Sequence, residues 1–498
     1  MESGKSGYKS IIKSTSLFGG VKFFQVIVNL LRGKIIAILL GPAGVGFNGL
    51  YQSTISIVSS ITGLGLNFSA VREISKANES GDIEKLSRSI KIFRRWQIIT
   101  VLLGFTAVLV FSGVLSRLTF GNGEYTLMFV LLSLMLVFNA LSDSNASILQ
   151  GARDLKGFAL HTLTGSVVSL VVSAPVYYIF GISGIVPALI LSAFITWLFS
   201  IWYSSRVRRI PVSVTFKEVR SEGGEMIKLG VAMMVTTSLA SLANYLVNIF
   251  IKGYGSIEDF GLYQAGMSIT TQSVGLIFTA MAVDYYPKLS AISDNNSKVR
   301  VMVNQQAEVM LLIATPILLM LMIAAPIVIR VLLSAEFASV SSFIRIIAVA
   351  LVFKAASYSI GAISYAKGDK KRFFILEGIY TNSSILLFSA AGYYLGGLNG
   401  LGYGFVLHHI AYLGVVLTVN KIYYRYTADK KVARMLLINI CGAFATLVVL
   451  ALLKGFIAIG ISTLIFLAIS AHSIIFIDKI LDIRGLITKA TNRNNQQV

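Results

Sequence analysis

A basic and amide-rich stripe near the N-terminus has residue types and spacing that suit anion binding. Lys22, Gln25, Asn29 and Arg32 follow one another at intervals of three or four residues, which places them on one face of an α-helix. Ammonium, guanidinium and amide groups donate hydrogen bonds to phosphate and carboxylate oxygens. The stripe therefore predicts a surface for an anionic group such as a phosphate or a diphosphate.

Other charged residues interrupt the apolar stretches that follow, namely Arg72, Asp143, Arg345 and Lys354. A charged side chain at the centre of a bilayer costs at least about 2.5–3.5 kcal/mol, so it tends to face a cavity or a partner. We expect Lys22 and Lys354 to line a cavity. Each arginine could line the cavity or lie outside it, and Arg72, near the end of its span, could reach the membrane surface instead. Asp143 is predicted either to neutralise one of these cations or to carry a coupling ion.

The chain contains an internal repeat. Gly49-Leu50-Tyr51-Gln52 recurs 212 residues later as Gly261-Leu262-Tyr263-Gln264, and Gly151-Ala152-Arg153-Asp154 has a weaker echo in Lys367-Gly368-Asp369. The two copies begin on the same side of the membrane, so the repeat is parallel. Parallel repeats are typical of transporters in which two lobes move about a central site.

Adding the same offset of 212 residues to the first stripe leads to a second polar stripe at the equivalent position of the repeat. It is made of Thr237, Ser241, Asn244 and Asn248. Polar faces on equivalent helices of two lobes would line a cavity between them, which makes Asn244 and Asn248 candidate substrate-binding residues. The alternative is that these groups form hydrogen bonds between helices, as is common in membrane bundles.

These stripes must be positioned by membrane-spanning helices. The 498 residues are 55% hydrophobic and 13% charged, and apolar runs recur along the whole chain. A lipid-exposed run of about 20 apolar residues must be helical, because hydrocarbon cannot satisfy its backbone groups. Hydropathy thus predicts an all-α polytopic protein with about fourteen spans. We place these spans near 11–39, 46–74, 92–114, 125–150, 159–180, 184–204, 229–252, 259–283, 306–329, 338–366, 374–395, 400–420, 435–453 and 456–477.

Basic residues orient the spans. The predicted outside loops contain few of the 43 lysines and arginines, namely Arg117, Lys252, Arg330 and Lys454. Because basic residues favour the cytoplasmic side, both termini are predicted to be cytoplasmic. The net charge of +21 is then mostly a topology signal, and nucleic-acid binding is not expected.

The expected organisation is an N-terminal six-helix lobe (1–204), a cytoplasmic linker (205–228), a C-terminal six-helix lobe (229–423), and two further helices with a cytoplasmic tail (424–498). The N-terminus leads into a first span that we expect to be retained. The single cysteine, Cys441, lies in an apolar run, so no metal site, disulfide or cofactor is predicted.

Several short segments resemble the multidrug/oligosaccharidyl-lipid/polysaccharide flippase superfamily, and within it the polysaccharide-transporter branch of O-antigen flippases. These segments are Leu39–Gly46, Gly63–Leu66, Ala70–Ile74 and Gln150–Ala152. The resemblance implies two six-helix lobes that open alternately to each side of a bacterial inner membrane. It implies a membrane transporter, not an enzyme, with basic lumen residues on the first two helices, as at Lys22, Arg32 and Arg72. We expect the protein to be a monomer.

The substrate implied by this resemblance is a polyprenyl-diphosphate-linked oligosaccharide, such as a repeat unit of O-antigen in lipopolysaccharide biosynthesis. A polysaccharide polymerase and a chain-length regulator are the partners that the family implies. Two alternatives stay open. A lipid II flippase needs the same cationic lumen, while a cation-coupled drug antiporter would use acidic residues instead.

Overall fold

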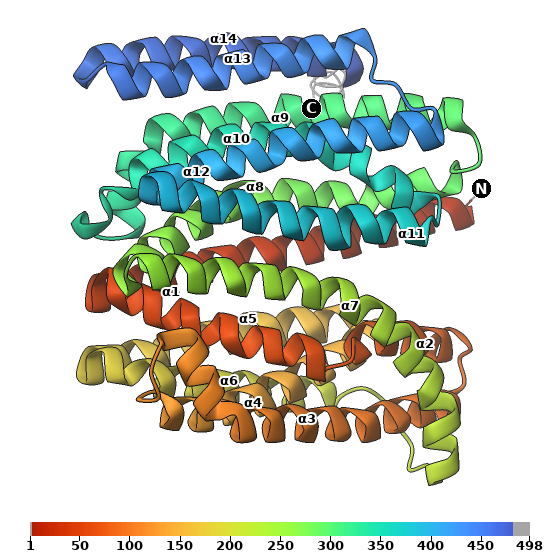
Figure 1. Cartoon of the computed structure of the whole chain (residues 1–498). Coiled ribbons are helices and arrows are strands. Elements are labelled where there is room, and N and C mark those ends of the chain that lie inside the picture. Colours follow the sequence, from red (N-terminus) through yellow and green to blue (C-terminus); the bar gives the residue numbers. More distant parts are fainter. Residues whose placement is uncertain (1, 482–498) are drawn as a thin grey trace, which may run out of the picture. The chain divides into compact units, whose positions relative to one another are not determined.

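The computed structural model describes residues 2–481, and these residues are helical, with no β-strand among them (Figure 1). The predicted all-α class is confirmed. The helices up to the linker are α1 (Glu2–Thr62), α2 (Leu66–Glu79), α3 (Ile83–Phe120), α4 (Thr126–Gly151), α5 (Leu155–Phe180), the 3₁₀ turn η1 (Gly181–Gly184) and α6 (Ile185–Ser204). Those after it are α7 (Phe216–Tyr254), α8 (Ile257–Ala291), α9 (Asn296–Leu332), the 3₁₀ turn η2 (Ala335–Phe337), α10 (Val340–Ala366), α11 (Lys370–Phe373), the π-helix η3 (Phe374–Tyr380), α12 (Thr381–Tyr424), α13 (Lys430–Leu452) and α14 (Gly455–Leu481).

Ten helical segments among the described residues are long and apolar enough to cross a membrane. Three of them, Gly19–Thr62, Leu155–Ser204 and Lys370–Tyr424, have 44, 50 and 55 residues, which is enough for two crossings each at about 20 residues per crossing. The ten segments thus have the length for thirteen crossings, and α8, which has 35 residues, is long enough for the fourteenth crossing predicted from hydropathy. The chain is therefore a polytopic membrane protein.

Glycines mark the breaks that divide two of the long segments. In α1, Gly41 has φ 64° and ψ −167° and precedes Pro42. Residues with a side chain rarely adopt this positive φ, whereas glycine does so readily. Proline also disfavours the helical conformation at the residue before it, which here is Gly41. Figure 1 shows α1 reversing direction there. In α12, Gly396 and Gly397 leave the helical region, and the two arms approach until a Cβ at Gly392 would lie 2.3 Å from the carbonyl oxygen of Gly400.

The continuous helix predicted over 46–74 is wrong in one respect, because α1 ends at Thr62 and α2 begins at Leu66. Gly65 has φ 60°, and a Cβ on it would lie 2.1 Å from the carbonyl oxygen of Gly230 in α7. Hydropathy cannot detect this break, because the interruption is apolar and its cause is the close approach of α7.

Contacts divide the chain into two compact units, one of Met1–Ala265 with Leu332–Glu336 and one of Gly266–Val331 with Phe337–Val498. The predicted lobe boundaries at 204, 228 and 423 stay a prediction, and the end of the predicted tail, 482–498, lies outside the described residues. The first unit has a buried apolar cluster that joins α2, α3, α4, α6 and α7. Its members include Leu66, Ile74, Ile90, Phe93, Ile148, Tyr203 and Met226.

The N-terminal end of α7 is held against α3 within the first unit. The Arg88 guanidinium forms ion pairs with Glu218 at 2.9 Å and Glu222 at 2.7 Å, and Trp96 donates a hydrogen bond to the carbonyl oxygen of Val219 at 2.9 Å. These contacts fix the chain that follows the linker. In the second unit α10 is the most enclosed helix, and α12 and α13 pack against it.

Candidate functional site

A polar face on the first unit is the first candidate site. Lys22 and Asn29 of α1 are exposed and Gln25 is half-buried, while Thr237 and Asn244 of α7 are also exposed. The Asn244 side chain donates one hydrogen bond to the carbonyl oxygen of Ala240 at 2.9 Å. Lipid offers no partners for such groups, so polar side chains within spanning helices tend to face a cavity or another polar group.

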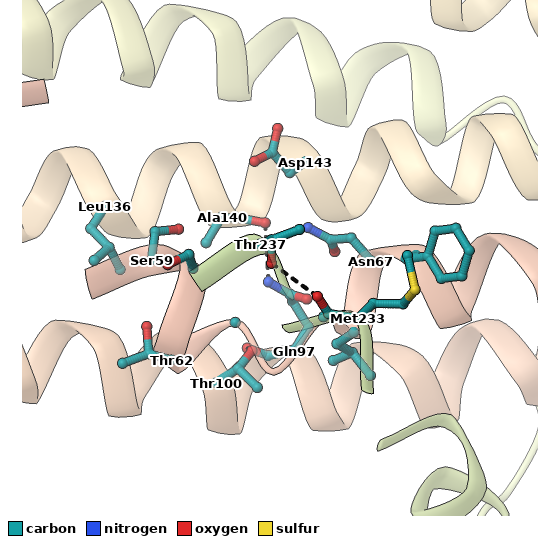
Figure 2. A pocket seen from close by; sticks show the side chains of 15 residues that line it. Ser59, Thr62, Asn67, Gln97, Thr100, Leu136, Ala140, Asp143, Met233 and Thr237 are labelled. Atoms are coloured by element: carbon teal, nitrogen blue, oxygen red, sulfur yellow. Dashed lines mark hydrogen bonds between the residues drawn. The ribbon is translucent and has the colours of Figure 1, made fainter. Parts of the chain in front are cut away.

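A cavity of about 270 Å³ lies within the first unit and is formed by α1, the Gly63–Gly65 break, α2, α3, α4 and α7. Figure 2 shows its polar side chains. The lining residues are Ser59, Ser60, Thr62, Gly63, Gly65, Leu66, Asn67, Phe68, Gln97, Thr100, Leu136, Ala140, Asp143, Met233 and Thr237. Two sequence-predicted residues, Asp143 and Thr237, are thus brought to one cavity.

The lining of this cavity consists mainly of hydroxyl and amide groups with a single carboxylate. Gln97 is held by a hydrogen bond from its amide nitrogen to the carbonyl oxygen of Ala140 at 3.1 Å. Asp143 is exposed to the cavity, and no described lysine or arginine forms an ion pair with it. Such a lining can bind a hydroxyl-rich or cationic group, but the residues that form it include no positively charged side chain for a phosphate. Sequence reasoning found Asp143 but missed Asn67, Gln97 and Thr100, which no repeat or stripe marks.

Arg32 is turned toward α5. Its guanidinium donates a hydrogen bond from Nη2 to Ser169 Oγ at 2.6 Å, and its Nε is buried without a hydrogen-bond partner among the described residues. Lys22 and Asn29 are exposed on the same helix. The predicted stripe is therefore split, with Arg32 partly engaged inside the unit.

Arg72 lines a separate cavity of about 560 Å³ in the first unit. Its Nε lies 3.9 Å from a carboxylate oxygen of Glu73. The charged residues around this cavity are Arg72, Glu73, Lys76, Glu222, Glu225 and Lys228. Both signs are present, so the cavity provides a mixed electrostatic environment in place of a purely cationic one.

The other predicted residues have contacts within their own units. Asn248 is buried. Arg345, in the second unit, donates hydrogen bonds to the carbonyl oxygens of Met322 at 3.2 Å and Leu450 at 3.5 Å, so its guanidinium binds α9 and α13. Lys354 of α10 is half-buried, and its Nζ lies 5.4 Å from the centre of the Phe278 ring.

Comparisons with known proteins agree with this fold. A family model described as polysaccharide biosynthesis protein matches residues 35–342. The lipid III flippases of Escherichia coli (strain K12) and Shigella flexneri are each 21% identical over 308 residues, covering 59% of this chain and 70% of each relative.

Two solved structures have similar folds. The lipid II flippase MurJ in an inward-closed conformation has a TM-score of 0.71 at 16% identity, over 93% of this chain and 99% of that chain. An inward-facing multidrug resistance transporter of the MATE family has a TM-score of 0.70 at 19% identity, over 80% and 94% of the two chains. At these identities the likeness concerns the fold alone.

Proposed function

This chain belongs to the polysaccharide biosynthesis protein family within the multidrug/oligosaccharidyl-lipid/polysaccharide flippase superfamily, and we propose that it translocates a polyprenyl-diphosphate-linked oligosaccharide. The substrate is a repeat unit of O-antigen or of another surface polysaccharide. The protein acts as a transporter, without catalysis of bond formation, in a bacterial inner membrane with both termini in the cytoplasm. The six-helix lobes of residues 1–204 and 229–423 alternate in opening to the two sides.

The exposed polar face of the first unit is the observation that carries this proposal. Lys22 and Asn29 present an ammonium and an amide where a spanning helix would otherwise expose apolar groups. A diphosphate cannot cross hydrocarbon alone, and these donors replace part of its hydration. The polyprenyl tail stays in lipid throughout.

The cavity beside this face fits the sugar part of the same substrate. Its hydroxyl and amide groups, with Gln97 and Thr237, and its single carboxylate offer donors and acceptors to the hydroxyls of an oligosaccharide. The inside-negative membrane potential assists the outward movement of the diphosphate, by about 2.3 kcal/mol per charge per 100 mV.

The test is the amount of polyprenyl-linked glycan on the inner leaflet of cells that depend on this protein. Lys22→Ala should cause accumulation and Lys22→Arg should restore flux, because arginine keeps the positive charge. Lys454→Ala is the matched control, since Lys454 is exposed in the loop between α13 and α14. Normal flux in Lys22→Ala at wild-type protein level would show that this lysine does not hold the substrate.

Asp143 favours a second candidate function, cation-coupled drug antiport. A carboxylate in a cavity without a described basic partner suits an organic cation. That function predicts drug sensitivity in Asp143→Asn cells with no change in lipid-linked glycan. Accumulation of lipid-linked glycan with unchanged drug sensitivity supports the flippase instead.

A lipid II substrate would be recognised by loss of peptidoglycan precursor turnover. A polymerase and a chain-length regulator are the proposed partners.

A further inference from the structure

A cluster of ionisable side chains lies inside the second unit. It consists of Lys354 on α10, Glu377 in η3, and His408, His409 and Tyr412 on α12. The proposed function assigns no role to any of these groups, although the sequence predicts that Lys354 lines a cavity. Charged and titratable groups at membrane depth are costly, so a cluster of them calls for a functional explanation.

Glu377 lies in the middle of the π-helix Phe374–Tyr380. The widened turn is supported by two side chains of the following helix. Thr381 donates to the carbonyl oxygen of Leu376 at 2.9 Å, and Asn382 donates to that of Gly378 at 2.7 Å. Single π-helical turns within membrane helices often mark functional positions, because they redirect a side chain and cost backbone energy.

The Glu377 carboxylate accepts a hydrogen bond from the Tyr412 hydroxyl, and the gap at Gly361 makes room for this pair. A Cβ at Gly361 would lie 2.5 Å from the Tyr412 hydroxyl oxygen and 3.2 Å from Oε1 of Glu377. The pair therefore depends on a residue without a side chain on α10.

Lys354 lies seven residues, or two helical turns, before Gly361 on α10, so it is on the same side of this helix as the glycine that faces Glu377. No ion pair within 4 Å joins Lys354 to Glu377 among the described residues. The described titratable groups around Glu377 and Lys354 are Tyr412, His408 and His409 of α12, and Tyr286 of α8. Of all these groups together, Lys354 is the one that is ordinarily cationic at neutral pH.

The two histidines are neighbours on α12 and their rings lie close together. His408 Nδ1 lies 2.9 Å from Ser384 Oγ, and the centres of the two imidazole rings are 4.7 Å apart. His409 Nδ1 is buried without a hydrogen-bond partner among the described residues. Two adjacent imidazolium ions beside Lys354 would repel one another, so Glu377 is the group in this cluster that can exchange a proton at least cost.

We propose that Glu377 is a proton-binding site and that its protonation releases Lys354 to hold an anion. With the carboxylate ionised, the charges of Glu377 and Lys354 compensate each other. When the carboxylate takes up one proton it becomes a neutral acid, and the lysine charge is left for a phosphate. Binding of the proton and binding of the anion then strengthen each other reciprocally. The second step rests on the proposed function, whereas the first does not.

The first experiment needs no substrate. Infrared difference spectra of the purified full-length protein are recorded between about pH 5 and pH 9, a range that includes raised carboxyl pKa values. We expect a protonated-carboxyl band that titrates in the wild type and in Asp143→Asn, and that is absent from Glu377→Gln. A wild-type spectrum without such a band, a band unchanged in Glu377→Gln, or a band lost in Asp143→Asn alone overturns the proposal.

A second variant covers the case in which Glu377→Gln does not yield folded protein. Tyr412→Phe keeps the ring and the carboxylate but removes the hydrogen bond, so it should displace the titration midpoint without abolishing the band. An unchanged midpoint in a folded Tyr412→Phe protein contradicts the assignment to Glu377.

The second experiment tests the link to the anion with farnesyl diphosphate as the probe. Glu377→Gln imitates the protonated acid, so at about pH 8 it should bind the probe about tenfold more tightly than the wild type. The two proteins should converge at low pH. Equal affinities at all pH values overturn the release of Lys354. If neither protein binds the probe, the proposed function fails, while the infrared result still decides the proton site.

Discussion

Asp154 and Asp369, 215 residues apart, cap two helices in the same way. The Asp154 carboxylate accepts a hydrogen bond from the backbone N–H of Gly157 at 2.8 Å. The Asp369 carboxylate accepts one from the backbone N–H of Arg372 at 3.1 Å. Each acceptor thus lies three residues before its donor, at equivalent places before α5 and α11.

The backbone around these two residues is also equivalent. Arg153 and Gly368, which precede them, have φ 59° and 68°. The N–H groups of Asp154 and Asp369 donate to carbonyl oxygens five residues earlier, at 2.9 and 3.0 Å. The two similar sequence segments thus form the same backbone turn. The residue with positive φ is Arg153 in the first copy and Gly368 in the second.

Asp369 should contribute more stability than Asp154. Loss of a helix cap costs about 1 kcal/mol, and both alanine variants lose one. Asp369 additionally pairs with the Arg372 guanidinium and accepts a hydrogen bond from the Tyr424 hydroxyl at 2.9 Å. We expect Asp369→Ala to lower the Tm of the purified protein more than Asp154→Ala, with exposed Asp294→Ala as the control. Equal shifts would mean that the extra contacts contribute nothing.

The contribution of Asp369 should also depend on pH. This residue lies between α10 and α11, outside the spanning helices. Partial burial alone would raise the pKa of its carboxyl, but hydrogen bonds from the Arg372 backbone and guanidinium outweigh burial, and the pKa lies below its ordinary value. The stabilisation is then complete above the unfolded pKa, about 3.9, and is lost as the pH falls through the folded pKa.

The measurement is the difference in Tm between the wild type and Asp369→Asn as a function of pH. It should be constant near neutral pH and shrink below about pH 4. A difference that persists unchanged in acid would assign the effect to packing instead of charge.

The fold was largely predictable because each spanning helix needs about 20 apolar residues, and that requirement is local. Gly41 with Pro42, and the glycines before residue 400, could be recognised as breaks from residue type alone. The break at Gly65 could not, since it depends on the backbone of Gly230, far away in the sequence.

The candidate site was predictable only in part. Helical spacing places Lys22 and Arg32 on related faces but does not say which neighbour each face meets. In the structure Lys22 is exposed and Arg32 binds Ser169 of α5. The Glu377 and Tyr412 pair joins two segments 35 residues apart in the chain, and no periodic pattern links them.

Membrane orientation can be tested with single cysteines on a Cys441→Ser background, since Cys441 is the chain's one native cysteine. Glu124 and Asp294 are both exposed in loops between helices. The distribution of basic residues predicts that Glu124→Cys faces outward and Asp294→Cys faces inward. A membrane-impermeant maleimide should label Glu124→Cys in intact spheroplasts, and Asp294→Cys after permeabilisation alone. The reverse pattern would invert the orientation and place both termini outside.

Two glycines allow helices of the first unit to touch backbone to backbone, namely Gly261, which begins the second Gly-Leu-Tyr-Gln copy, and Gly46, three residues before the first copy. A Cβ at Gly261 of α8 would lie 1.9 Å from the carbonyl oxygen of Pro42, and one at Gly46 of α1 would lie 2.2 Å from that of Ile257. Small residues permit this approach between membrane helices. The motif is therefore repeated at a contact surface, in addition to beginning a helix in each half.

Gly261→Ala should consequently destabilise the protein by about 1–3 kcal/mol, as expected for overpacking. Gly253→Ala is a matched control, because a Cβ at Gly253 has nothing within 4 Å, and replacing this glycine by alanine at the end of α7 should leave stability unchanged or slightly raised. We would compare the Tm of both purified variants, and then the lipid-linked glycan in cells expressing them at equal levels. A Gly261→Ala protein that matches Gly253→Ala in both measurements would show that α1 and α8 do not approach this closely.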